Sequence, residues 1–217
     1  MLRLKMLYPL IACAGILIAA VAAVVGQIDP DPYLDPLNLT ISEYAVLDRG
    51  GATEFAMMSL GVASFALVAG LRSVRAPVGT AAERLMLVWS AALVLIAVVP
   101  TVAPGMVLDL GAQVHRYVSV GAFAAMPVAG MLMVTSLSQD ERWRAAARPV
   151  EWLSLAGGFG LLAITYVALP GDRVLIGLVE RVLLGAEVAL VAVLAVRLLQ
   201  LTWIRSTSTH ASQAVLG

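Results

Sequence analysis

The stretch that decides the fold is V-L-I-G-L-V-E-R-V-L-L-G-A-E-V-A-L-V-A-V-L-A-V-R-L-L-Q-L, which occupies residues 174–201. Within it, residues 182–201 form an apolar run interrupted only by Glu187, Arg197 and Gln200. A bilayer's hydrocarbon core of roughly 30 Å is crossed by about 20 apolar residues in a helix. This run therefore predicts a membrane-spanning helix, which we expect to extend upstream to about Val174.

Five further runs have a similar character and precede this one. They are residues 6–25, 55–71, 85–99, 118–137 and 152–169, and the second reaches spanning length when residues 52–54 are added. None alternates with a period of two, so helices are expected and barrel strands are not. The first run is too long for the apolar part of a typical cleaved signal peptide. The sequence predicts an all-α, polytopic bundle of six transmembrane helices, a single domain over residues 1–205 with a short cytoplasmic tail over 206–217.

The composition agrees with a membrane protein. Of 217 residues, 61% are hydrophobic and 13% are charged, against about 45–50% and about 25% in soluble domains. Lys and Arg number 14, as do Asp and Glu, so no net positive charge favours nucleic acid as a partner. The single cysteine, Cys13, excludes an intramolecular disulfide and a cluster of thiolate ligands.

The basic residues predict the orientation, since short loops rich in Lys and Arg stay in the cytoplasm. Ten of the 14 fall on the side of the two termini, whereas Arg49, Arg116, Arg173 and Arg181 fall on the other. We therefore expect a multi-pass protein of the cell membrane, an inner or plasma membrane, with both termini in the cytoplasm.

The longest connection, residues 27–51, is expected outside the cell. Within it, Thr40-Ile41-Ser42-Glu43 has the form of a capping box, in which a hydroxyl and a carboxylate each accept a hydrogen bond from the other's backbone N–H. The pattern predicts a short extracytoplasmic helix over residues 41–49, between the first two spans. Its apolar residues are expected to rest on the membrane surface or to cover the outer mouth of the bundle.

Polar residues that a lipid-facing helix would not carry gather at the outward ends of the predicted spans. Glu54 opens the second span, His115 and Arg116 open the fourth, and Glu180, Arg181 and Glu187 belong to the sixth. Glu180 and Glu187 are seven residues apart and therefore share a helix face. A charge at the bilayer centre costs about 2.5–3.5 kcal/mol on insertion scales, so Glu187 is expected to face the interior of the bundle.

These residues are candidates for an outward-facing site. We assign Glu187, Glu54 and His115 as candidate catalytic residues, and as candidate substrate-binding residues Glu180, Arg181, Arg116, Arg49, Asp48, Glu43 and Tyr44. The alternative is that the cluster consists of structural ion pairs and hydrogen bonds between helices. No cofactor or metal is predicted, because the chain lacks paired cysteines and histidines at zinc-ligand spacing, phosphate loops and dinucleotide fingerprints.

Several short motifs resemble a bacterial integral-membrane family known as domain of unknown function 998. They are Ile41-Ser42-Glu43-Tyr44-Ala45-Val46-Leu47 followed by Gly50, then Pro100-Thr101, then Gly111 with Val114-His115-Arg116. The resemblance implies a six-helix membrane fold and supports the outward polar cluster, but it implies no activity. In that family an acidic residue often follows the Pro-Thr pair, and here Val102 stands in its place, so no role for that carboxylate carries over.

Three functions remain open on the sequence. The first is an extracytoplasmic pocket that binds or processes a lipophilic or amphipathic small molecule such as a lipid or isoprenoid, with acid-initiated isoprenoid cyclisation or isomerisation as one enzymatic version. The second is a non-enzymatic accessory or assembly subunit of a larger membrane protein complex. The third is a small secondary transporter, which the absence of evident inverted repeats disfavours.

Overall fold

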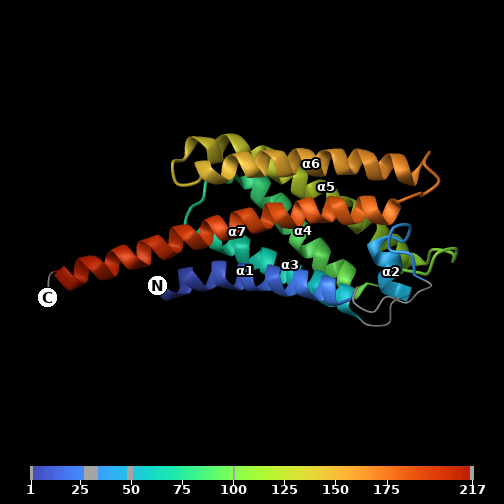
Figure 1. The fold of residues 1–217 in the computed structure, drawn as a ribbon, viewed down its shortest axis with the longest axis horizontal. Helices are drawn as coiled ribbons and strands as arrows, with labels where there is room; N and C mark the ends of the chain where they lie inside the picture. Colours follow the sequence, from blue (N-terminus) through green and yellow to red (C-terminus); the bar gives the residue numbers. More distant parts are fainter. Residues whose placement is uncertain (1, 27–33, 48–50, 100, 216–217) are drawn as a thin grey trace.

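In the computed structural model the protein is a bundle of six long helices with one short helix at its end (Figure 1). The structure describes residues 2–26, 34–47, 51–99 and 101–215. Within these ranges, it describes the side chains from Met6 to Trp203. The helices are α1 (Leu2–Val25), α2 (Ile41–Leu47), α3 (Ala52–Ser73), α4 (Thr80–Val98), α5 (Leu110–Gln139), α6 (Arg144–Ala168) and α7 (Ile176–Val215). The all-helical fold is confirmed, and all six long helices are long and apolar enough to cross a membrane.

The long helices form a closed ring in chain order. Each packs on the next, and α7 returns to pack on α1 while also contacting α3 and α5. Successive long helices are antiparallel, so both ends of the chain lie at one end of the bundle and α2 lies at the other (Figure 1). We call these the terminal end and the α2 end. The last helix continues to Val215, through the segment that the sequence assigned to the tail.

Small residues allow the helices to approach closely, as is usual when lipid rather than water surrounds a bundle. A Cβ added to Gly15 of α1 would lie 2.7 Å from the Cβ of Ala63 on α3. The buried layer toward the terminal end is formed by large apolar side chains, including Met86, Met133 and Leu194, each fully buried. Large apolar residues such as Leu17 and Phe159 face outward instead, as expected of a lipid-facing surface.

The terminal end carries several ion pairs. Arg72 pairs with Glu83 across the link between α3 and α4, with 2.6 Å between Nη2 and Oε1. Arg148 and Glu151, three residues apart on α6, form a surface pair at 3.8 Å. Asp140 has its pKa held below the usual range by a hydrogen bond from the side chain of Arg142. The Arg72 pair joins α3 to α4, the Arg142 pair lies in the link between α5 and α6, and the Arg148 pair lies within α6.

Candidate functional site

The α2 end is closed by a segment that we call the α2 strap, residues 34–47. It begins with a turn in which the Asp35 carboxylate accepts hydrogen bonds from the backbone N–H of Leu37 and the side chain of Asn38. These bonds, the one from Asn38 first, lower the pKa of Asp35 from its ordinary value. The predicted capping box is confirmed, because Thr40 N–H donates to Glu43 Oε2 at 3.0 Å and Glu43 N–H donates to Thr40 Oγ1 at 3.2 Å.

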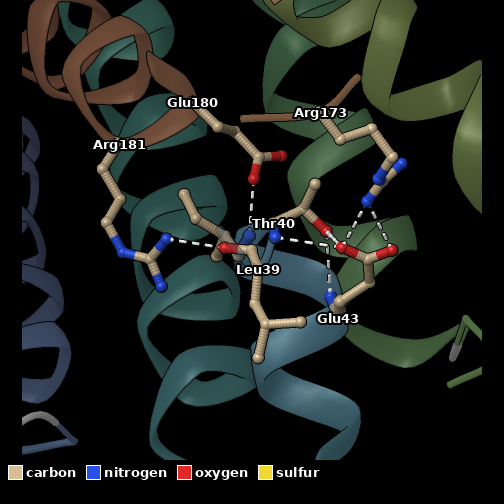
Figure 2. Close-up of polar contacts among 7 residues, drawn as sticks. Leu39, Thr40, Glu43, Arg173, Glu180 and Arg181 are labelled. Atoms are coloured by element: carbon tan, nitrogen blue, oxygen red, sulfur yellow. Dashed lines mark hydrogen bonds and ion pairs between the residues drawn. The ribbon is translucent and has the colours of Figure 1, made fainter. Parts of the chain in front are cut away.

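The amino-terminal turns of α7 hold the α2 strap in place (Figure 2). Glu180 accepts a hydrogen bond from the backbone N–H of Ile41, the first residue of α2. The Nη1 of Arg181 donates to the carbonyl oxygens of Pro36 and Leu39, at 2.7 and 3.0 Å, and its guanidinium lies 5.6 Å from the ring centroid of Tyr44. The predicted outer helix is thus fixed to the last span by long-range contacts.

Two further features bring the α2 strap against α7. Arg173, in the link before α7, pairs with both carboxylate oxygens of Glu43 at 2.7 Å. At Gly177 the α2 strap and α7 approach so closely that an added Cβ would overlap the carbonyl oxygens of Leu39 and Pro36. Only glycine fits this position without displacing the α2 strap.

Beneath α2 lies a cavity of about 230 Å³, which we call the α2 chamber. Its polar lining comprises Ser42 of α2, Thr53 and Glu54 of α3, Thr101 of the link between α4 and α5, and His115 of α5, and its remaining lining residues are apolar. Glu54 lies in the first turn of α3, and its Oε2 is buried without a hydrogen-bond partner among the described residues. A carboxyl oxygen in this state is a ready acceptor for a ligand.

His115 joins the wall of the α2 chamber to α2 itself. Its Nδ1 lies 2.6 Å from the carbonyl oxygen of Val99, and its Nε2 lies 2.8 Å from Ser42 Oγ. A carbonyl can only accept, so Nδ1 carries a hydrogen. In the neutral ring Nε2 is then an acceptor, and the Ser42 hydroxyl donates to it.

A second, smaller cavity of about 10 Å³ lies deeper in the bundle, and we call it the Glu187 cavity. Glu187 and Glu180 both line it, together with Ser42, Ser119 and Trp89. Glu187 is 1% exposed, and its Oε2 accepts a hydrogen bond of 3.2 Å from the indole Nε1 of Trp89. The predicted inward direction of Glu187, and the shared face with Glu180, are confirmed.

The sequence of this chain matches a known protein family. Residues 13–197 match the family described as "Protein of unknown function (DUF998)". The chain belongs to this family. Neither a curated protein nor a solved structure matches it. The DUF998 match therefore supports the fold, and the chemistry of the site has to be inferred from its own residues.

The candidate site residues of this DUF998 protein fall into separate groups. Glu54 and His115 line the α2 chamber, Glu187 lines the Glu187 cavity, and Glu180 lines that cavity while it also holds α2. Glu43, Tyr44 and Arg181 make contacts that fix the α2 strap. Arg116 is exposed and is not among the lining residues of either cavity. Asp48 and Arg49 lie outside the described residues.

Sequence reasoning missed two residues that shape the site. Ser42 lines both cavities, and Trp89 is the hydrogen-bond partner of Glu187. A signal for Trp89 was present, since tryptophan in spanning helices usually lies at the membrane interface whereas Trp89 is midway along its helix. A buried indole N–H in such a position needs an acceptor.

The arrangement offers mainly acceptors to a ligand. Glu54, Thr53 and Thr101 line a largely apolar space, and the Oε2 of Glu54 has no hydrogen-bond partner among the described residues. No described Lys or Arg lines the α2 chamber. The site therefore suits a small molecule with an apolar body and a hydrogen-bond-donating or cationic end.

Proposed function

We propose that this DUF998 protein binds a small amphipathic molecule in the α2 chamber, from the extracytoplasmic side of the cell membrane. The observation that carries the proposal is the buried, unpartnered Oε2 of Glu54 in the wall of a 230 Å³ cavity. Buried polar groups without partners are rare in proteins, and one that lines a cavity calls for a ligand or ordered water. The excess of basic residues at the terminal end supports an outward-facing α2 end.

The lining defines the chemistry of the ligand. Because Arg181 is engaged by the α2 strap and Arg116 is exposed, neither serves as a clamp for an anion in the α2 chamber. An alkylammonium or other donor-bearing end satisfies the Glu54 carboxyl, and Ala45, Val46 and Ile96 contact the apolar part. A charge-assisted hydrogen bond of this kind is stronger than a neutral one.

The volume of the α2 chamber limits the size of the ligand that it can hold. Its 230 Å³ is below the roughly 300–1,000 Å³ of drug-sized ligand sites. A compound with a short chain fits, whereas a lipid or isoprenoid places only its polar end there. Glu54 and His115 act in this proposal as binding groups, and proton donation to a bound molecule would be a further step.

The test starts from the intact protein purified in a mild detergent. Mass spectrometry under native conditions is expected to detect a small molecule that carries an amine or hydroxyl end on an apolar body, on the wild type and on the Glu141→Gln variant. Glu141 is an exposed carboxylate of the terminal end and serves as the matched control. The Glu54→Gln variant is expected to lose the molecule while keeping its thermal stability.

Two outcomes would contradict the proposal. Equal retention of the molecule by Glu54→Gln would remove Glu54 from the site. A stoichiometric protein partner, with no small molecule on any variant, would favour an accessory subunit of a membrane complex instead.

A further inference from the structure

Glu187 uses only one of its two carboxyl oxygens within the bundle. Oε2 accepts from the Trp89 indole, and Oε1 is buried with no hydrogen-bond partner among the described residues. No cation of the described residues forms an ion pair with it, although the side chain is 1% exposed. An ionised carboxylate in such surroundings would keep a negative charge that nothing compensates.

The hydrogen bond from Trp89 indicates which oxygen of a neutral Glu187 carboxyl carries the hydrogen. An indole N–H donates and never accepts, and the carbonyl oxygen of a carboxylic acid is a better acceptor than its hydroxyl oxygen, which favours Oε2 as the carbonyl oxygen of the pair. The hydroxyl is then Oε1, the oxygen that lacks a protein partner. Its hydrogen is available to an acceptor in the Glu187 cavity.

The Glu187 cavity matches one water molecule. Its volume of about 10 Å³ is close to the smallest that holds a water, and such a water needs two to four polar partners. The lining supplies Glu187, Glu180, Ser42 and Ser119. The Ser119 hydroxyl donates to the His115 carbonyl, which leaves its oxygen free to accept.

The path from this cavity leads toward the α2 end. Ser42, Met57 and Ile96 line both the Glu187 cavity and the α2 chamber, so the two spaces share a wall. In the other direction along α7, Leu190 is 1% exposed and Leu194 is fully buried. This apolar layer separates Glu187 from the terminal end.

Among described side chains, Glu180 is the one other titratable group that lines the Glu187 cavity. The remaining titratable or charged side chains on the helices around it lie toward the helix ends, apart from Cys13 of α1. They are Tyr8 of α1, Glu43 and Tyr44 of α2, Glu54 and Arg72 of α3, Glu83 and Arg84 of α4, His115, Arg116 and Tyr117 of α5, Arg144, Arg148, Glu151 and Tyr166 of α6, and Arg181 and Arg197 of α7.

We infer that Glu187 and its cavity form a proton-binding site within the membrane, a carboxylic acid joined by one water to the α2 chamber and closed toward the terminal end. The proton resides on Oε1, and it exchanges through the cavity water and the Ser42 hydroxyl. This exchange needs no ligand in the α2 chamber. A result that rules out the binding of a small molecule at Glu54 would therefore not rule out this proton-binding site, and the reverse also holds.

Infrared difference spectroscopy of the intact protein in lipid tests this inference. At neutral pH, the wild type minus Glu187→Gln spectrum is expected to contain the C=O band of a carboxylic acid, and transfer to D₂O is expected to shift it. The Glu54→Gln variant is the control and keeps the Glu187 band. Carboxylate bands in place of the acid band would overturn the inference, and so would an acid band that does not respond to D₂O.

A second variant covers the case in which Glu187→Gln does not fold. Trp89→Phe removes the donor to Oε2 and leaves the carboxyl in place, so the C=O band of Glu187 is expected at higher frequency. Because a carbonyl that loses a hydrogen bond stiffens, an unchanged spectrum in this variant would also overturn the inference.

Discussion

The indole Nε1 of Trp89, on α4, donates a hydrogen bond of 3.2 Å to Oε2 of Glu187, on α7. Both side chains are buried, Trp89 fully and Glu187 to within 1%. The bond links helices that are not neighbours in the ring, since α4 packs on α3 and α5 while α7 packs on α6 and α1. It therefore crosses the interior of the bundle and gives the acidic side chain its one hydrogen-bond partner among the described residues.

This bond predicts a difference between two tryptophan substitutions. Trp89→Phe leaves Oε2 of Glu187 without a donor and is expected to lower the free energy of unfolding by about 1–3 kcal/mol. Trp143→Phe is the matched control, because Trp143 is fully buried and its Nε1 has no partner among the described residues. Unfolding in detergent, followed by far-UV circular dichroism, measures both. An equal loss in the two variants would show that ring volume, and not the hydrogen bond, determines the effect.

The close approach at Gly177 predicts a local effect on the α2 strap. In Gly177→Ala the methyl group would overlap the carbonyl oxygens of Leu39 and Pro36, so the contacts of Arg181 are expected to break. A loss of about 1–3 kcal/mol is typical of overpacking. Gly185→Ala, on the same helix with open space at the Cβ position, is expected to behave as the wild type. Hydrogen exchange of residues 34–47 reports the difference, and unchanged protection in Gly177→Ala would contradict the observed packing.

The turn at Asp35 predicts how the α2 strap responds to acid. The pKa of Asp35 is lowered in the folded protein, chiefly by the hydrogen bond from Asn38, so its contribution to stability is present above the ordinary value of 3.8. That contribution is lost as the pH falls through the lowered value. Pepsin is expected to cut within residues 34–47 faster as the pH decreases below this range. Asp35→Asn is expected to show the faster rate throughout, and identical pH profiles for the two proteins would refute the role of the carboxylate.

The excess of basic residues at the terminal end predicts the orientation in the cell. In a Cys13→Ala background, a cysteine replacing Val107, which is 92% exposed near the α2 end, is expected to react with a membrane-impermeant maleimide on intact spheroplasts. A cysteine replacing the exposed Glu141 at the terminal end is expected to react only after lysis. The reverse pattern would place the α2 chamber in the cytoplasm.

Local sequence patterns were sufficient to predict the fold. Apolar runs of spanning length predicted the six long helices, and the reciprocal hydrogen bonds of Thr40 and Glu43 formed as the capping box required. The inward direction of Glu187 followed from the cost of a charge in lipid. These properties depend on one helix or one turn at a time, so sequence reasoning could reach them.

The roles within the cluster depend on contacts between distant segments and were harder to predict. Arg181 and Glu43 resembled ligand-binding groups, yet the structure shows them holding the α2 strap to α7 and its preceding link. The wall between the two cavities is shared by Ser42, Met57 and Ile96, which come from three different helices. Nothing local to Ser42 marks it, because its partner, His115, lies 73 residues away in the chain.

Calorimetric titration with hexylamine, hexanol and hexanoate tests the central claim, ligand binding at Glu54 in the α2 chamber, most directly. The account predicts that hexylamine binds the wild type and Glu141→Gln alike and that hexanoate does not bind. It also predicts that Glu54→Gln weakens hexylamine binding by about 10- to 100-fold, as expected when a charge-assisted hydrogen bond of about 1.5–3 kcal/mol is lost. Equal affinity of hexylamine for the wild type and Glu54→Gln, or a preference for hexanoate, would contradict it.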